Sequence, residues 1–181
     1  MVEVGTTNRT HLRDFESAIT DKTEVMLVVH PSNYKVLGFT ADVDIRDLAG
    51  LGAKHSIPVI HDLGGGVLID MERFGLPREP LVSESVIAGA DVVTFSGDKV
   101  LGGPQAGVIV GKREPIEAIR QNPLMRALRC GKLTYAALEA TLKLFLNPDR
   151  LLETHPTLRM FTESADVLTQ RGNSILNSLS D

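Results

Sequence analysis

The sequence has no tryptophan and only one cysteine, Cys130, among its 181 residues. A single cysteine cannot form an internal disulfide, and no group of cysteine and histidine residues has the spacing of metal ligands. Long apolar runs are missing as well, since the longest, Val25–Val29, is far shorter than the roughly 20 residues that span a bilayer. The segment Met1–Arg9 has no apolar stretch of the kind found in signal peptides. We therefore expect a cytoplasmic protein that is neither exported nor embedded in a membrane.

A large excess of charge of either sign is also absent. Nineteen Lys and Arg residues stand against 23 Asp and Glu residues, a formal net charge of −4. This excludes a protein that binds a polyanion over its whole surface, and it leaves room only for a local basic patch. One window, Lys112–Lys132, has six basic residues and two acidic ones. It is either an anion-binding patch or a solvated helix face.

Short apolar strands alternate with amphipathic helices along the first two thirds of the chain. Strands that are apolar throughout, separated by helices, are typical of a parallel sheet covered on both faces. We therefore predict an α/β fold with a mostly parallel, three-layer sheet, followed by the start of a helical C-terminal portion. The predicted strands are Glu24–His30, Pro58–Asp62, Asp91–Phe95 and Ala106–Gly111, and the predicted helices include Asp44–His55, Ser83–Ala88, Thr134–Leu146 and Leu158–Gln170.

A glycine-rich turn, His61–Gly66, follows the second predicted strand, but it does not have the pattern of a nucleotide-binding loop. The dinucleotide fingerprint needs a third glycine where this sequence has Ile69. The lysine at position 99 is followed by Val100 rather than Ser or Thr, so no phosphate-binding P-loop is present, and Gly-x-Ser-x-Gly is absent too. Nucleotide-binding and serine-hydrolase functions lose their main support.

Two residues with useful chemistry, Asp62 and Lys99, each follow a predicted parallel strand. Ligands of open α/β sheets bind at the carboxyl ends of the strands, so both residues are expected at one site. A lysine buried in an apolar pocket can attack a carbonyl and form a Schiff base, and a carboxylate is the partner that a pyridinium nitrogen needs. The pair therefore favours pyridoxal phosphate. The simpler alternative is that Asp62 caps a turn and Lys99 is solvated.

Several longer segments make the sequence specific enough to compare with a known family. They resemble bacterial selenocysteine synthases, the L-seryl-tRNA(Sec) selenium transferase family, in register from Glu3 to about Phe161. The resemblance is carried by Glu3–Thr10, His30–Tyr34, Gly38–Thr40, Asp62–Gly66, Phe74–Pro77, Phe95–Gly107 and Pro123–Arg129.

The resemblance implies a fold-type I pyridoxal-phosphate transferase. In it Lys99 would carry the cofactor, Asp62 would hold the pyridine nitrogen, and Asp98 would contribute to catalysis. Gly64 and Gly65 would belong to the cofactor-binding turn, although the family usually has Ser where this sequence has Gly65. The lost hydroxyl would weaken a contact in or near the cofactor site.

The same resemblance implies substrate contacts elsewhere in the chain. Arg126 and Arg129 would bind the anionic selenium donor, selenophosphate, although an ordinary charged helix surface remains the alternative for them. Thr6 and Thr7 would form an anion-contacting turn that reaches a neighbouring subunit of a homo-oligomer. The implied reaction is the conversion of L-seryl-tRNA(Sec) to L-selenocysteinyl-tRNA(Sec).

The family chain is longer than this sequence, which lacks counterparts of its tRNA-binding domain and of the first part of its large domain. We predict a partial cofactor-binding large domain in residues 1–130, and a helical connection with the start of the C-terminal domain in residues 131–181. Such a chain is expected to be inactive alone. Two alternatives stay open: a related pyridoxal-phosphate lyase acting on a small amino acid or amino sugar acid, and a non-catalytic remnant. Gly102–Gln105 and Arg126–Arg129 favour the transferase over the lyase.

Overall fold

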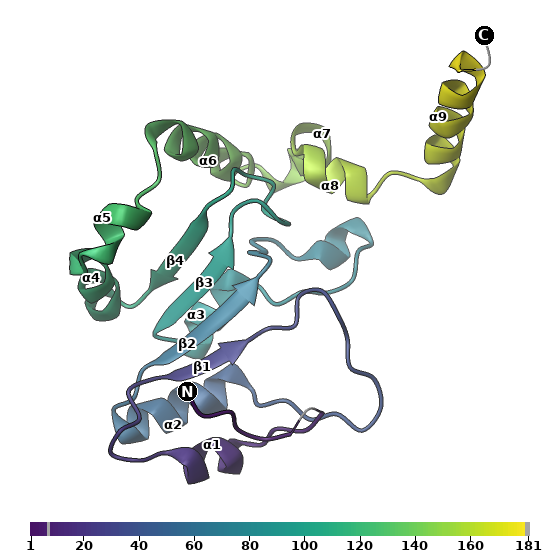
Figure 1. Cartoon of the computed structure of the whole chain (residues 1–181). Coiled ribbons are helices and arrows are strands. Elements are labelled where there is room, and N and C mark those ends of the chain that lie inside the picture. Colours follow the sequence, from purple (N-terminus) through teal and green to yellow (C-terminus); the bar gives the residue numbers. More distant parts are fainter. Residues whose placement is uncertain (7, 180–181) are drawn as a thin grey trace.

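Four strands form the sheet at the centre of the chain, in the order β1-β2-β3-β4. The computed structural model describes residues 1–6 and 8–179. β1, β2 and β3 are parallel, and β4 runs antiparallel to β3 at the edge of the sheet (Figure 1). The predicted mostly parallel sheet is therefore confirmed. The bounds are Met26–Val29 for β1, Val59–Gly64 for β2, Val92–Ser96 for β3 and Gly107–Gly111 for β4.

Helices connect the parallel strands and make up most of the last third of the chain. Their bounds are Leu12–Ala18 (α1), Ile45–His55 (α2), Val82–Ala88 (α3), Arg113–Gln121 (α4), Leu124–Leu128 (α5), Lys132–Leu144 (α6), Leu151–Thr154 (α7), Pro156–Phe161 (α8) and Ala165–Ser178 (α9), with short 3₁₀ helices at Met71–Phe74 and Pro148–Arg150. Among the described residues, no helix is long and apolar enough to cross a membrane.

One predicted helix, Leu158–Gln170, is wrong in its boundaries. The structure divides this segment into α8, which ends at Phe161, and α9, which begins at Ala165. The break has a local cause, because the Ser164 hydroxyl accepts a hydrogen bond from the Val167 N–H (3.3 Å) and so caps a new helix. The helical periodicity on both sides of residue 164 concealed this cap.

The apolar core lies between one face of the sheet and helices α2 and α3. Met26 and Val59 pack against Leu48 and Leu51 of α2, while Val93 belongs to a second cluster that includes residues of α3. Alternate residues of a strand point to opposite faces, so this face takes every second side chain of β1, β2 and β3. Burial of these aliphatic side chains supplies the main stabilisation of the sheet.

The opposite face of the sheet remains open. The register aligns Val29, Asp62, Thr94 and Ile109 in one row across the four strands. Val29 is 61% exposed and Ile109 is 39% exposed. The fold class is confirmed as α/β, but within the described residues the expected second helical layer does not cover this row. Asp62 thus lies on an uncovered surface of the sheet.

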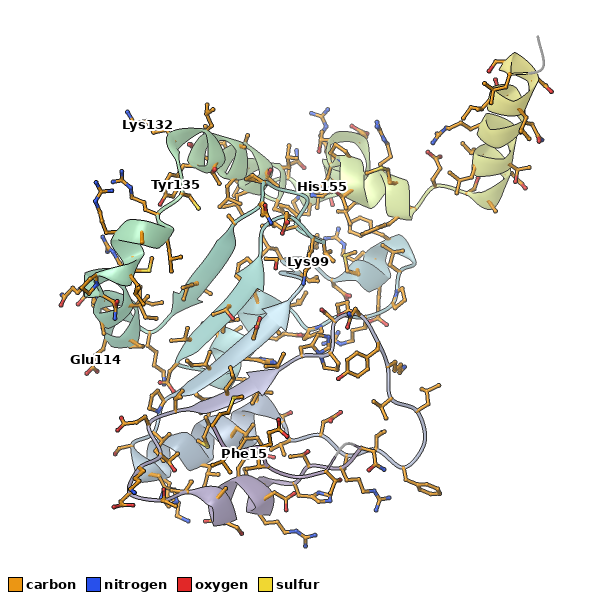
Figure 2. All side chains as sticks on the ribbon, viewed as in Figure 1. Phe15, Lys99, Glu114, Lys132, Tyr135 and His155 are labelled. Carbon is orange, nitrogen blue, oxygen red and sulfur yellow. The ribbon has the colours of Figure 1, made fainter. Side chains whose placement is uncertain are left out.

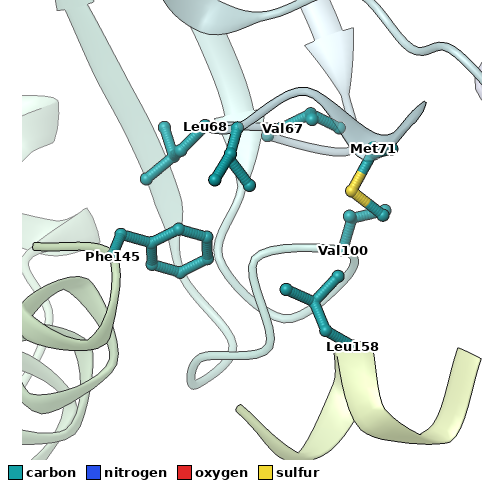
Figure 3. A pocket seen from close by; sticks show the side chains of 8 residues that line it. Val67, Leu68, Met71, Val100, Phe145 and Leu158 are labelled. Carbon is teal, nitrogen blue, oxygen red and sulfur yellow. The ribbon is translucent and has the colours of Figure 1, made fainter. Parts of the chain in front are cut away.

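The helices that follow β4 pack at the end of the sheet where β3 finishes. Leu151 and Leu158 are buried in a cluster with Val67 and Met71, which follow β2. Figure 3 shows this meeting point from close by, with Val100 and Phe145 among the apolar side chains that line it. Figure 1 shows α9 projecting away from the rest of the fold. The division into residues 1–130 and 131–181 stays a prediction, and the two parts share this apolar cluster.

Candidate active site

Lys99 lies in a tight turn directly after β3. The turn is closed by two backbone hydrogen bonds, from the Gly102 N–H to the Lys99 carbonyl (2.9 Å) and from the Gly103 N–H to the Gly97 carbonyl (2.7 Å). The Lys99 side chain extends toward the end of β2, where its Nζ lies 3.8 Å from the position that a Cβ on Gly64 would occupy. The topology of the sheet, rather than closeness in sequence, therefore brings this amine to the glycine-rich turn (Figure 2).

Asp62 approaches the same turn from within β2. Its Oδ1 accepts a hydrogen bond from the Gly64 N–H (3.1 Å), and its carbonyl accepts one from the N–H of His30 (2.8 Å). Gly64 is thus a shared neighbour of the Asp62 carboxylate and the Lys99 amine. The structure brings these two predicted site residues to one edge of the sheet, as the strand-end argument requires. Their chemical roles stay predictions.

The surroundings of Lys99 differ from the sequence-based expectation. A lysine buried in a mainly apolar pocket was expected, whereas Lys99 is exposed. The physical reason is the open face of the sheet, because no described element lies over the row that contains Asp62. The lysine and the carboxylate therefore form one half of a site, which the described residues leave uncovered on the open face of the sheet.

The half-site formed by Lys99, Asp62 and Gly64 fits a flat ligand with an aldehyde and a ring nitrogen. Gly64 has a φ of 64°, and a Cβ at this position would lie 2.7 Å from the Ser32 Oγ. The absence of that Cβ leaves a cradle bounded by a hydroxyl, an amine and a carboxylate. Gly65 beside it is buried, and a Cβ at that position would lie 3.5 Å from a methyl group of Val100. Pyridoxal phosphate is held by a lysine amine at its aldehyde and by a carboxylate at its ring nitrogen. The residues present therefore fit the group that the resemblance implies.

Gly64→Ala is expected to destabilise the chain by about 1–3 kcal/mol, because the left-handed backbone strains a residue with a Cβ and Ser32 must also move. Gly65→Ala is the matched control. Its new Cβ would make an ordinary contact of 3.5 Å with Val100, without left-handed backbone. We expect a change within about 0.5 kcal/mol for the control. Urea unfolding of the three proteins measures both values, and equal effects would contradict the assignment of strain to Gly64.

A histidine that sequence reasoning missed lies beneath the site. His61 is buried, and its Nδ1 lies 3.0 Å from the Ser85 Oγ of α3. Burial lowers the pKa of His61, and the nearby His30 charge lowers it further. His30 in turn contacts the Glu79 carboxylate (3.0 Å) at the end of β1. His30 directly follows β1 and His61 lies within β2, and their sequence spacing does not indicate these contacts.

The lowered pKa of His61 predicts a pH-dependent stability. Above the unfolded pKa of about 6.5 the ring is neutral in both states, so its contribution is fully present. As the pH falls below that value the unfolded chain binds the proton first, and stability declines by at most about 1.4 kcal/mol per pH unit. We expect His61→Gln to flatten this decline between about pH 7 and pH 5. His55→Gln, at an exposed position, should leave it unchanged, and equal slopes for all three proteins would contradict the prediction.

Apart from Asp98, the remaining predicted site residues that the structure describes are not gathered around Lys99 within one chain. Asp98 adjoins Lys99 but is exposed. Arg126 lies in α5 and Arg129 directly follows it; both are exposed, on the side of the sheet where β4 forms the edge (Figure 1). The Thr6 hydroxyl donates to the Arg9 carbonyl (2.6 Å) in the N-terminal segment. Thr7 lies outside the described residues.

Comparisons with known proteins give the family context of this site. The family model of L-seryl-tRNA selenium transferase matches residues 1–181. An L-seryl-tRNA(Sec) selenium transferase of Alkaliphilus oremlandii is 55% identical over 179 residues, which is 99% of this chain and 38% of that protein. The corresponding protein of Nitratidesulfovibrio vulgaris is 57% identical over 173 residues, covering 96% of this chain and 37% of that protein. The chain thus spans less than two fifths of the length of these relatives.

Solved structures confirm the predicted fold-type I arrangement. A D-glucosaminate-6-phosphate ammonia-lyase superposes with a TM-score of 0.64 at 28% identity, covering 80% of this chain and 36% of that one. An alanine aminotransferase from Pyrococcus furiosus gives a TM-score of 0.52 at 19% identity, covering 92% and 40%. A serine palmitoyltransferase from S. paucimobilis, with bound PLP, gives 0.52 at 16% identity, covering 79% and 36%. The last two likenesses concern the fold alone.

Proposed function

The chain belongs to the family of L-seryl-tRNA selenium transferases, and from this premise we propose that its residues form part of a site that converts L-seryl-tRNA(Sec) to L-selenocysteinyl-tRNA(Sec) with selenophosphate. The observation that carries the proposal is the meeting of the Lys99 amine and the Asp62 carboxylate at Gly64. A reaction on charged tRNA belongs in the cytoplasm. Because the chain covers 38% of its relative, the complete activity is assigned to the longer family protein.

The proposed cofactor is pyridoxal 5'-phosphate, and this chain supplies three of its contacts. Lys99 would hold its aldehyde carbon covalently through Nζ, and Asp62 would pair with its pyridine nitrogen. The backbone at Gly64 and Gly65 would leave space for the flat ring. When bound, the group supplies an electron sink that acidifies the Cα–H of the seryl residue. An ionised carboxylate at Asp62 keeps the ring nitrogen protonated, which strengthens that sink.

Lys99 would have a second task whenever its Nζ is not holding the cofactor. Its Nζ is then free to accept the proton from the seryl Cα and to deliver a proton to the β-hydroxyl, which leaves as water. The exposed Asp98 carboxylate, next in sequence, would assist in moving these protons. Selenium from selenophosphate would then bond to Cβ while its bond to phosphorus breaks and water takes the phosphoryl group as inorganic phosphate, so that a selenol replaces the hydroxyl.

Arg126 and Arg129 are proposed to bind selenophosphate, since guanidinium groups form paired hydrogen bonds with phosphate oxygens. Both lie on the β4 side of the sheet rather than beside Lys99, and Thr6 lies in the N-terminal segment. We therefore propose a homo-oligomer in which residues from more than one copy complete each site. Thr7 is assigned the same role as Thr6 on the basis of the sequence resemblance.

The alternative lyase function has weaker support. The ammonia-lyase with the similar fold is 28% identical to this chain, whereas the selenium transferases are about twice as similar in sequence. The arginine pair in Arg126–Arg129 also fits an anionic selenium donor. The transferase is therefore the better supported reaction, and the lyase remains a measurable competitor.

A chimaera tests the proposal directly. Residues 1–181 replace the matching segment of the Alkaliphilus oremlandii relative, and the fusion is expressed in a bacterium without its own selenium transferase. We expect incorporation of radioactive selenium into selenoproteins to be restored, because this chain supplies the lysine and the carboxylate. The chimaera carrying Lys99→Ala should give none.

Three controls make the outcome decisive. Immunoblotting confirms equal amounts of the two chimaeras, and circular dichroism confirms that both are folded. Lys54→Ala removes an exposed lysine outside the basic window, whose Nζ pairs with Glu16 (2.8 Å), and it should leave selenium incorporation unchanged. A folded chimaera that incorporates no selenium but releases ammonia from an amino sugar acid would replace the proposed reaction with the lyase.

A further inference from the structure

His155 is a buried histidine that no step of the proposed reaction uses. It lies between α7 and α8, is 1% exposed, and makes two hydrogen bonds to backbone groups. Its Nδ1 accepts from the Leu158 N–H (3.1 Å), and its Nε2 lies 2.9 Å from the Leu101 carbonyl oxygen. Its ring also meets the edge of Phe145, with the ring centres 5.2 Å apart.

These two partners determine which ring nitrogen carries the proton. Nδ1 accepts a hydrogen bond from a backbone N–H, so it holds a lone pair rather than a proton. Nε2 faces a carbonyl oxygen, which can only accept, so Nε2 must be the N–H donor. The ring is therefore a neutral imidazole in one tautomer, and it joins the first turn of α8 to the backbone of Leu101.

Leu101 belongs to the turn that carries Lys99. The next residue, Gly102, donates its N–H to the Lys99 carbonyl (2.9 Å) and has a φ of 70°. A Cβ on Gly102 would lie 2.6 Å from the His155 Cε1 and 2.7 Å from the Thr157 Oγ1, so the turn and the histidine are in close contact. Figure 2 shows Lys99 and His155 on adjoining segments at this end of the sheet.

We propose that His155 is a positioning residue for Lys99: by donating from Nε2 to the Leu101 carbonyl, it fixes the turn that aims the lysine amine at Gly64. Lys99 is exposed, and no described element covers the face of the sheet beside it. The conformation of the turn therefore depends on contacts that its backbone makes on the opposite side. That support comes from the segment after residue 150, which links the helical C-terminal portion to the site. The importance of this geometry for cofactor attachment rests on the proposed function.

Two substitutions separate the bond to Leu101 from the cap on α8. In His155→Asn, the amide oxygen can replace Nδ1 and cap α8, but the side chain is too short to reach Leu101. In His155→Gln, the amide nitrogen can replace Nε2 and donate to Leu101, while the cap is lost. Ser164→Ala is the matched control, because it removes the cap of α9 without touching the Lys99 turn.

The first measurement is amide hydrogen exchange by NMR on the full 181-residue chain without cofactor. The Gly102 and Gly103 amides close the turn, so they report on its opening. We expect both to exchange at least about tenfold faster in His155→Asn, and close to the wild-type rate in His155→Gln and Ser164→Ala. The second measurement is the rate at which pyridoxal phosphate becomes fixed to Lys99 on borohydride reduction, which should fall only in His155→Asn.

Opposite results would overturn the proposal. Unchanged Gly102 and Gly103 exchange in folded His155→Asn, or faster exchange in His155→Gln than in His155→Asn, would leave His155 as a helix cap only. If His155→Asn does not fold, the test rests on His155→Gln, where loss of protection at both amides contradicts the proposal. Altered exchange together with no fixation of pyridoxal phosphate to the wild-type chain would contradict cofactor attachment at Lys99 in the isolated chain and leave the support of the turn intact.

Discussion

Lys99→Ala is expected to abolish the borohydride-stable attachment of pyridoxal phosphate, a loss of about 100-fold or more. The reason is geometric, because the Lys99 Nζ lies 3.8 Å from the position of a Cβ on Gly64, beside the Asp62 carboxylate. Among the described residues, other lysines are held in ion pairs: Lys54 with Glu16 (2.8 Å), Lys112 with Asp91 (2.7 Å) and Lys143 with Glu139 (2.6 Å).

The measurement is reconstitution with pyridoxal phosphate, reduction with borohydride and peptide mapping by mass spectrometry. Wild-type chain should carry the label on the peptide that contains Lys99, and Lys112→Ala should carry the same label in the same amount. Asp62→Asn should retain the site of labelling with a weaker affinity, since the partner of the ring nitrogen is lost. Label found mainly on Lys54 or Lys112 of the wild-type chain would remove Lys99 from its assigned role.

The parts of this fold that the sequence predicts well are those set by local chemistry. The predicted helix at Asp44–His55 matches α2, whose first turn is capped by the Asp44 Oδ1 accepting from the Arg46 N–H (2.7 Å). The apolar run before Asp62 predicts β2, because the strands of parallel sheets, which are usually covered on both faces, have near-continuous apolar sequences. Once the strands are parallel, their carboxyl ends share an edge. The meeting of Asp62 and Lys99 follows from that rule.

Other features depend on contacts between distant segments, and the sequence pattern does not reveal them. The His155 ring bonds to Leu101, 54 positions away, and nothing in the spacing around either residue indicates this pairing. The exposure of Lys99 is a second case. A strand pattern that is apolar on both faces predicts two covering layers, but the row through Val29 and Ile109 has none within the described residues. Whether a face of the sheet is covered depends on other elements of the chain, and the sequence of a strand does not show where those elements pack.

The 181-residue chain by itself is expected to form no selenocysteinyl-tRNA above background, at least about 1000-fold below a full-length relative. The chain carries Lys99 and Asp62, so a lack of reactive groups is not what limits the rate of the reaction. The limit is binding, since a net charge of −4 gives little attraction for a polyanion outside the window Lys112–Lys132. Arg126 and Arg129 within that window lie away from Lys99, so a single chain does not hold the donor beside the amine.

The open face of the sheet leads to the same expectation. Lys99 is exposed, and the row through Val29, Asp62 and Ile109 is uncovered, so water reaches the groups that would exchange protons with the seryl residue. Water screens the charge interactions on which the proposed proton transfers depend. A substrate as large as tRNA also needs extensive contacts to hold its seryl end in place, and this chain covers 38% of the relative that acts on it.

The assay is selenium incorporation into seryl-tRNA(Sec) with purified protein, pyridoxal phosphate and selenophosphate. The Alkaliphilus oremlandii relative is the positive control, and the chimaera described above shows whether residues 1–181 work when the rest of the family chain surrounds them. We expect turnover from both and none from the isolated chain. Turnover of the isolated chain comparable to that of the relative would mean that a half-open site suffices, and that neither the covering of Lys99 nor the additional length is needed to orient tRNA. Failure of the chimaera as well would instead place the defect in the residues of this chain, with Gly65 the first position to exchange for serine.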